Sequence, residues 1–476
     1  MPRIGTDEWV AQAEERAERP PGLRGVALGA WQRAPLPARY APFVVVAIVF
    51  PFIAASTYQE RVGLDTLRFA LLALGLNVVV GWAGLLDLGY VAFFGFGAYA
   101  YAFLSSGQFH THWPAEATIP IVIAASALLG LLLGLPSRRL VGDYLAIVSL
   151  FFAQIFVTLA NNGDRFSLLG FKGPYNLTNG PNGIAGIDPL SFFGLDLGTV
   201  RSLFWFTLLA TVLVMAGLHF LNESRTGRAW RALREDPLAA ELMGMPVNRL
   251  KLLAFVFGAA TAGLTGTIFA SVQESVFPQN FDVPLLITIY TMVILGGAGS
   301  LPGVVIGAIV VNGTLEALRT PDQARWVFYG GIVLALVSFL RPWWRLAAVC
   351  AGTVVLGIVV FQVVDAVRPS WTSGKIKGGG LASLLDGWVV HPAYSTRLGN
   401  IGFVLLVVAV IGLMQLRGLL RIVFLVPVLY LAAFAWENRL VLEPSVTRLI
   451  LLGSLLIALM IARPEGLLGT KRVEII

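Results

Sequence analysis

Stretches of about twenty predominantly apolar residues recur along most of this chain, and each is long enough to cross the hydrocarbon core of a bilayer as a helix. Only 13% of the 476 residues are charged and 57% are hydrophobic, whereas ordinary soluble domains are about 25% charged. These features predict an all-α polytopic integral membrane protein with about 10–14 transmembrane helices. The apolar segments lie near residues 41–58, 64–82, 88–106, 118–136, 144–161, 201–221, 251–272, 283–299, 302–319, 326–341, 346–365, 399–416, 419–436 and 446–463.

Glycines interrupt two of these segments, at residues 95–97 and 296–303. Broken or re-entrant helices are the alternative at both places. Gly299, Gly303 and Gly307 repeat every four residues, which on a helix aligns small residues on one face and lets another backbone approach closely. Helix packing is the expected role of these three glycines, and a thin helix beside a substrate path is the alternative.

The basic residues that give the chain its net charge of +7 are concentrated in short loops between apolar segments. Such loops mark the cytoplasmic face of a membrane protein, so this distribution argues against nucleic acid as a partner. It predicts that both termini lie in the cytoplasm. Two longer loops, near 162–200 and 366–398, then lie outside. The first is rich in Asn, Gly and Pro and is either a surface loop or a gate or docking surface above a pathway.

A polar segment at 222–251 falls on the cytoplasmic side. Asp236 followed by Pro237 is a helix start, because Asp caps free amides and Pro at the first helical position loses no hydrogen bond. Gly244 is a natural helix end. We therefore expect a short helix from Pro237 to Met243 between two spans. It docks either in a groove on another protein or on lipid headgroups. Its apolar residues are Leu238, Leu242 and Met243.

Asp87 is one of few ionisable residues near the apolar segments, where a charge is costly and usually faces a cavity or a partner. It is the best single candidate for a functional buried charge. It is equally a candidate to cap the helix that follows, because an Asp side chain accepts hydrogen bonds from free amides.

Six motifs, in order, resemble those of one membrane family. The segment SRTGRAWRALREDPLAAELMGMPVNRLKLLAF at 224–255 resembles the cytoplasmic coupling loop of the permease subunit of branched-chain amino acid ABC importers, the LivM-like family. The family usually has Gly at the position of Asn179. The other similar stretches are GWAGLLDLGYVAF at 81–93, GDYLAIV at 142–148, LTNGPNGI at 177–184, LGGAGSLPG at 295–303 and RPEGLLG at 463–469.

The resemblance covers roughly residues 42–340 and 446–470, which implies a helical block inserted near 345–440. The expected organisation is a cytoplasmic tail at 1–40, a permease core at 41–342 with its coupling loop near 222–250, and two further parts. These are an additional transmembrane block at 343–445, with its outside loop near 366–398, and a closing helix with a cytoplasmic tail at 446–476.

The family resemblance implies a permease subunit in a bacterial cytoplasmic (inner) membrane that forms a translocation path for branched-chain or related amino acids. It implies a second related permease chain, two ATPase subunits that hold ATP and Mg, and a soluble extracytoplasmic substrate-binding protein. The residues expected to couple to the ATPases are Glu235, Asp236, Pro237, Leu238, Leu242, Met243 and Gly244. Candidates for the path or gate are Asn77, Asp87, Tyr90, Thr178 and Asn182.

No catalytic site is expected in this chain. Gly374-Lys375-Ile376 lacks the upstream glycine and the hydroxyl of a nucleotide-binding loop, so no cofactor or ATP site is predicted. No metal site is expected, although His110 and His112 flank one residue. The alternative function is an ion- or proton-coupled secondary transporter of small polar solutes, which would carry buried relay charges. A membrane enzyme would need a convergent acid, base or metal cluster.

Overall fold

The computed structural model describes residues 36–440, with gaps at 55, 138–139, 141, 166–175, 341–342, 375–384 and 393–395. It also describes 447, 450–451, 453–454, 457 and 466–468. Most of the predicted N-terminal tail and of the predicted closing helix at 446–463 therefore lies outside the described residues. The first described helix begins at Leu36, inside the predicted tail.

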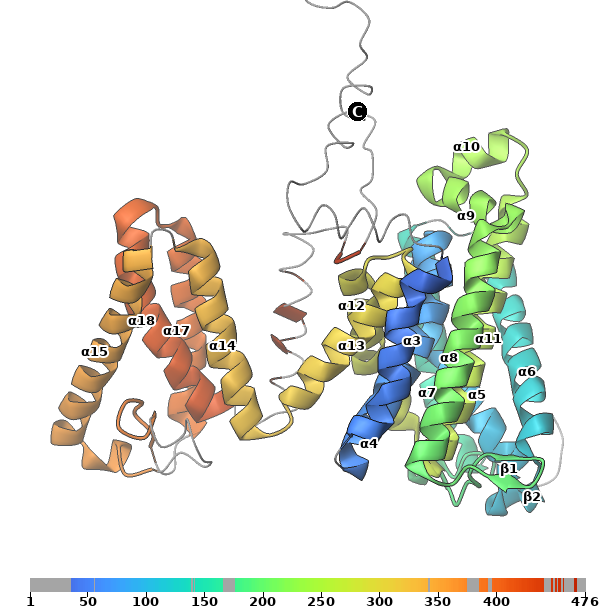
Figure 1. Ribbon diagram of the computed structural model, residues 1–476, viewed down its shortest axis with the longest axis horizontal. Coiled ribbons are helices and arrows are strands. Elements are labelled where there is room, and N and C mark those ends of the chain that lie inside the picture. Colours follow the sequence, from blue (N-terminus) through green and yellow to red (C-terminus); the bar gives the residue numbers. More distant parts are fainter. Residues whose placement is uncertain are drawn as a thin grey trace, which may run out of the picture.

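Long helices make up the first and larger part of the molecule (Figure 1). They are α3 (Leu36–Ile53), α4 (Thr57–Leu76) with a π-helical end η1 (Asn77–Trp82), α5 (Tyr90–Leu104), α6 (Ala115–Ser137), α7 (Asp143–Asn161), α8 (Val200–Glu223), α11 (Val247–Gln273), α12 (Val283–Gly296) and α13 (Leu301–Ala317). Two short helices, α9 (Arg225–Glu235) and α10 (Pro237–Leu242), connect α8 to α11. We call all of these helices, including α9 and α10, the core bundle.

A second bundle contains α14 (Pro321–Phe339), α15 (Trp343–Val367), α17 (Thr396–Gln415) and α18 (Gly418–Ala435), which continues as the π-helix η7 (Trp436–Leu440). The sequence placed residues 321–339 in the permease core, but the structure packs α14 into this bundle. Arg325 of α14 binds Glu437 of η7 through Nε at 3.0 Å, and both side chains are buried. Phe328 of α14 also stacks on Trp436. Helix α14, which the predicted permease core at 41–342 includes, therefore packs with the helices of the predicted additional block.

Among the described residues, nine helices are long and apolar enough to cross a membrane, and two shorter apolar helices, α5 and α13, accompany them. The first thirteen predicted apolar segments each coincide with a helix. The prediction of an all-α polytopic membrane protein is confirmed. Its physical basis is that a helix satisfies its own backbone hydrogen bonds, which no water can satisfy inside the bilayer.

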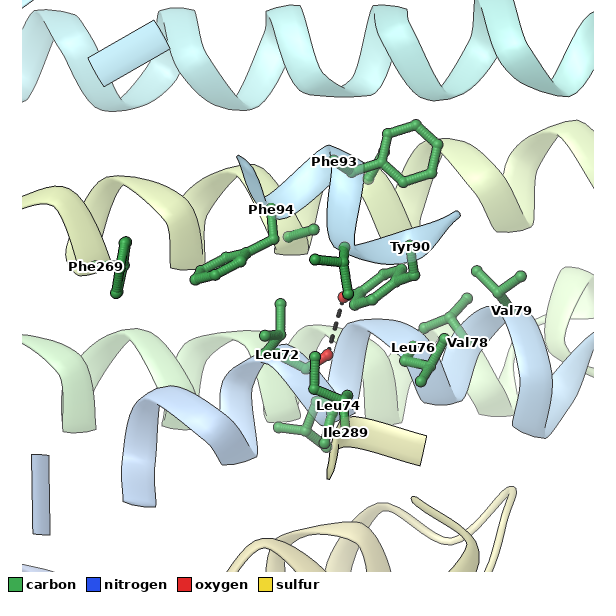
Figure 2. Close-up of a cluster of buried hydrophobic side chains, with 14 of the residues drawn as sticks. Leu72, Leu74, Leu76, Val78, Val79, Tyr90, Phe93, Phe94, Phe269 and Ile289 are labelled. Carbon is green, nitrogen blue, oxygen red and sulfur yellow. Dashed lines mark hydrogen bonds between the residues drawn. The ribbon is translucent and has the colours of Figure 1, made fainter. Parts of the chain in front are cut away.

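Among the core-bundle helices long enough to span a membrane, α4 and α11 are the most buried. Glycines bring α11 against α5, because a Cβ on Gly97 would lie only 2.5 Å from the Cα of Gly263. The alternative of a broken or re-entrant helix at residues 95–97 is wrong. Helix α5 is continuous, and these glycines serve close packing instead. Figure 2 shows the adjoining cluster of buried side chains, in which the Tyr90 hydroxyl donates to the Leu72 carbonyl at 2.9 Å.

Short strands lie at one end of the core bundle, opposite α9 and α10 (Figure 1). We call this the hairpin end and the opposite one the α9–α10 end. Three antiparallel pairs form there: β1 (Ser105–Ser106) with β2 (Thr111–His112), β3 (Ile184–Ala185) with β6 (Ser275–Val276), and β4 (Ser191–Phe192) with β5 (Leu195–Asp196). The short 3-10 helices of the described residues are η2 (Gly107–Phe109), η3 (Gly163–Arg165), η4 (Gly180–Asn182), η5 (Pro278–Phe281) and, in the second bundle, η6 (Pro369–Trp371).

Candidate functional site

The α9–α10 segment is a helical hairpin whose caps are set by sequence. Ser224 begins α9 by accepting a hydrogen bond from the Gly227 amide. Asp236 ends α9 and begins α10, where its Oδ1 accepts from the amides of Leu238 at 2.8 Å and Ala239 at 3.1 Å. Helix α10 ends at Leu242, one residue earlier than predicted, and Met243 is its C-cap.

One face of α10 carries apolar side chains that no other described residue covers. The exposed fractions are 67% for Leu238, 80% for Leu242 and 81% for Met243. Ala240, on the inner face, is buried. Glu235 and Pro237 are exposed beside this surface, and Gly244 leaves the helix with a φ of +80°, a conformation that favours glycine. The structure therefore brings all seven sequence-predicted coupling residues together on one projecting segment.

Trp230 of α9 attaches this segment to α11 and to η1. The indole is fully buried, and its Nε1 donates to the Leu250 carbonyl of α11 at 2.8 Å. Its ring stacks on Trp82 with centroids 6.1 Å apart. Because an indole satisfies its polar atom and buries a large apolar surface at the same time, Trp230 fixes α9 on the core.

Trp82 belongs to η1, which forms hydrogen bonds with the turn between α12 and α13. The Trp82 Nε1 donates to the Gly299 carbonyl at 3.0 Å, and the Gly299 amide donates to Asn77 Oδ1 at 2.7 Å. Residues five apart stand roughly 140° apart around an α-helix. In the wider π-helix, with its i to i+5 hydrogen bonds, they come closer to the same side. The π-helical end of α4 thus lets Asn77 and Trp82 hold both backbone groups of one glycine.

The glycine repeat at 299, 303 and 307 does not lie on one helix. Gly299 has a φ of +98° and sits in the turn before α13, so its predicted place in a helix stripe is wrong. Gly303 and Gly307 are on α13 and face α12. A Cβ on Gly307 would lie 2.0 Å from the Met292 carbonyl oxygen, so these two positions allow close helix contact.

Asp87 is buried in the loop between η1 and α5. Its Oδ1 accepts from the Gly89 amide at 2.9 Å, one residue before α5 begins, while Oδ2 has no hydrogen-bond partner among the described residues. The Tyr290 hydroxyl of α12 donates to the Asp87 backbone carbonyl at 2.7 Å. Asp87 therefore organises the start of α5 and also leaves one buried carboxylate oxygen unpaired.

The five candidate path residues form two groups, one around η1 and the other at the hairpin end of the core bundle. Asn77, Asp87 and Tyr90 are buried together in and beside the core around η1. Thr178 and Asn182 lie at the hairpin end, where the Thr178 hydroxyl donates to the Ala160 carbonyl of α7 at 2.6 Å and Asn182 is exposed. The five candidates for the path or gate therefore do not form a single cluster.

Sequence reasoning missed Trp82, Trp230 and Arg234 as functional candidates. The Arg234 Nη1 of α9 donates to the Gly81 carbonyl at 2.5 Å and lies 3.4 Å from the Ala298 carbonyl. The sequence offered one signal for the two tryptophans, since Trp82 lies in a glycine-rich stretch and Trp230 in the polar segment at 222–251. Two of the partners of Arg234 are backbone carbonyls, which leave no mark in a sequence.

The described residues contain no group of three or more His, Cys, Asp or Glu side chains able to hold a metal ion. Of the two histidines near the hairpin end, His112 pairs through Nδ1 with Asp188 Oδ2 at 2.5 Å.

Spanning helices with two interrupted segments among them, and a projecting capped helix at one end, define a multi-pass membrane protein. The family described as branched-chain amino acid transport system / permease component matches residues 64–337. LivM of Escherichia coli K12, a high-affinity branched-chain amino acid transport system permease protein, is 36% identical over 323 residues, 63% of this chain and 72% of that protein.

Two further relatives carry the same kind of name. LivH of Salmonella typhimurium is 29% identical over 267 residues, 53% of this chain and 82% of that protein. BraD of Pseudomonas aeruginosa is 36% identical over 136 residues, 28% of this chain and 43% of that protein. No solved structure matches this chain. The chain belongs to the family of branched-chain amino acid transport permeases and is a permease subunit of an ABC importer.

Proposed function

We propose that this chain forms the translocation path for branched-chain or related amino acids together with a second, related permease chain. Two ATPase subunits drive it from the cytoplasm, and a soluble binding protein delivers substrate from outside. The names of LivM, LivH and BraD support the substrate class and the pairing of two permeases. The positive charge of the 222–251 segment supports placing the α9–α10 end, and both termini, in the cytoplasm.

The observation that carries this proposal is the exposed apolar face of α10. Leu238, Leu242 and Met243 form an exposed apolar surface, and such surfaces mark interaction sites. A short helix with an apolar face fits a groove on a partner protein. Each of these side chains contributes roughly 1.5–3 kcal/mol when it is fully buried. ATP hydrolysis then belongs to the subunits that receive α10.

The charged side chains in and near the described spans favour this function over a secondary transporter. Arg68 pairs with Asp65 at 3.0 Å, Arg201 pairs with Glu60, and Arg325 pairs with Glu437. A proton or ion relay needs titratable groups that can exchange partners along a route. The pairs of Arg201 with Glu60 and of Arg325 with Glu437 instead join neighbouring helices, and the pair of Arg68 with Asp65 lies within α4.

Replacing Leu242 and Met243 by aspartate tests the docking of α10. We expect the double variant to lose at least about 100-fold in affinity for the ATPases, because two unpaired charges would be buried at the contact. The measurement is co-purification of the ATPase subunits with the permease.

The matched control is Leu242→Met with Met243→Leu, which keeps the apolar surface and should keep the ATPases. Neither variant alters a spanning helix. If the double aspartate variant retains its ATPases at the wild-type ratio, α10 lies on lipid headgroups and the proposed coupling surface is wrong.

A further inference from the structure

We propose that Arg234 is a positioning residue that transmits movement of α10 to two interrupted segments at the α9–α10 end. These segments are η1 and the turn at 297–300, and we call them together the inner lock. The inference rests on the proposed function, because the movement comes from the ATPases that hold α10. In this structure Arg234 contacts both segments of the inner lock.

The first support is the geometry of the guanidinium. Arg234 Nη1 reaches the Gly81 carbonyl in η1 at 2.5 Å and lies 3.4 Å from the Ala298 carbonyl in the turn. One side chain therefore contacts both halves of the inner lock. An arginine suits this task because its donors are fixed in a planar fork and always carry positive charge.

The second support is the close fit around the Arg234 side chain. A Cβ on Gly299 would lie 2.9 Å from Arg234 Nη1, and a Cβ on Gly84 would lie 3.0 Å from Arg234 Cγ. Both glycines have positive φ, +98° and +67°, so glycine provides both the space and the backbone conformation. Gly84 and Gly299 therefore leave the space that the Arg234 side chain occupies.

The third support is the direct connection to α10. Asp236, two residues after Arg234, is at once the C-cap of α9 and the N-cap of α10. A displacement of α10 is therefore carried to Arg234 with no flexible linker between them. On the same side of α9, Trp230 stacks on Trp82, the residue that donates to Gly299.

A further segment contacts the end of α12 beside the lock. The amides of Leu467 and Leu468 donate to the carbonyls of Leu295 and Gly296, at 2.8 and 3.1 Å. These bonds satisfy carbonyls that the end of α12 leaves free. The turn at 297–300 is thus held on one side by the chain's C-terminal segment and on the other by η1 and Arg234. Withdrawal of Arg234 leaves Asn77 and Trp82 as the direct links between η1 and Gly299.

The test is Arg234→Gln in the complete importer in proteoliposomes, with leucine as the transported probe. We expect the ATPases to co-purify at the wild-type ratio, since α10 is unchanged, and ATP hydrolysis to continue. The amount of leucine transported per ATP hydrolysed should fall at least tenfold. A merely structural role would lower hydrolysis and transport together and leave their ratio unchanged.

The matched control is Arg231→Gln on the same helix, because Arg231 Nη1 donates to Asn222 Oδ1 at the end of α8, at 3.0 Å, and to neither segment of the inner lock. Its transport per ATP should equal that of the wild type. Trp82→Phe serves as an independent variant. It keeps an aromatic ring against Trp230 but removes the donor to Gly299, so it should lower the same ratio.

A second readout measures the lock directly. In a Cys350→Ala background, Ala298→Cys is labelled by an impermeant maleimide added at the α9–α10 side. Without ATP, adding Arg234→Gln should raise the labelling rate at least fivefold.

Wild-type transport per ATP in both Arg234→Gln and Trp82→Phe, or an unchanged labelling rate, overturns the inference. Failure of the proposed function looks different, because the unaltered permease would then not retain ATPases at all.

Discussion

At the residue scale, Asp87 combines the two roles considered for it, because it binds an amide at the start of α5 and is also a buried carboxylate. Burial raises the pKa of the Asp87 carboxyl to about 6, and hydrogen bonding by Gly89 and Ser149 acts in the opposite direction. The folded protein therefore binds this proton more tightly than the unfolded chain does. The stability it contributes is present below the ordinary Asp pKa, near 4, and is lost as the pH rises through about 6.

We expect Asp87→Asn to raise the thermal stability of the detergent-solubilised protein at pH 8 and to change it little at pH 4.5. The asparagine oxygen can still accept from the Gly89 amide, while the buried charge disappears. At pH 8 the free energy of unfolding of Asp87→Asn should exceed that of the wild type by at most about 3 kcal/mol, because each pKa unit corresponds to about 1.4 kcal/mol. Melting temperatures of both proteins from pH 4.5 to 8 measure it.

The control for this prediction is Asp87→Ala, which removes the hydrogen bond to Gly89 and should be destabilising across the same pH range. A gap between wild type and Asp87→Asn that is constant with pH, or widest in acid, would contradict the account of this carboxyl.

At the element scale, two glycine clusters that look alike in the sequence have opposite structures. Residues 95–97 lie within the continuous helix α5, whereas the chain at 296–303 leaves α12 and enters α13 through the turn at 297–300. The difference was in the flanking residues, because Ser300 caps α13 by accepting from the Gly303 amide and Pro302 fits its first turn. No such start follows residues 95–97. Local capping chemistry therefore decides where glycines break a helix.

The capped element at α10 gives a prediction of its own. Asp236→Ala removes the acceptor for two amides and should cost about 1 kcal/mol of helix stability. That corresponds to roughly a fivefold loss of ATPase affinity if α10 must be folded to dock. Asp236→Asn keeps the cap and should bind nearly as the wild type does. Titration of the purified ATPase against each variant measures this, and equal affinity for all three would show that α10 need not be helical to bind.

At the scale of the whole molecule, the sequence predicted helices far better than their assembly. Apolar length identifies a span because the bilayer demands it, so thirteen of the predicted segments match helices. The position of α14 could not be predicted in this way. It depends on the ion pair of Arg325 with Glu437, 112 residues apart in the chain. The contacts of Arg234 with Gly81 and Ala298, 153 and 64 residues away, are equally invisible in sequence.

The α10 residues were predictable as a group because their signals are local. An Asp-Pro start and a Gly end fix a short helix, and the polarity of the surrounding segment keeps it out of the bilayer. Its attachment to the inner lock required the structure, since Trp230 reaches its partners through tertiary packing. The projecting surface was thus visible in the sequence, whereas its link to the membrane part was not.

The measurement that tests the central claim most directly is leucine uptake into proteoliposomes that contain this chain. The account predicts uptake only when the second permease, the ATPases, the binding protein and ATP are all present, and no uptake by this chain alone under a proton or sodium gradient. Uptake by this chain alone, driven by an ion gradient and independent of ATP, would contradict the account.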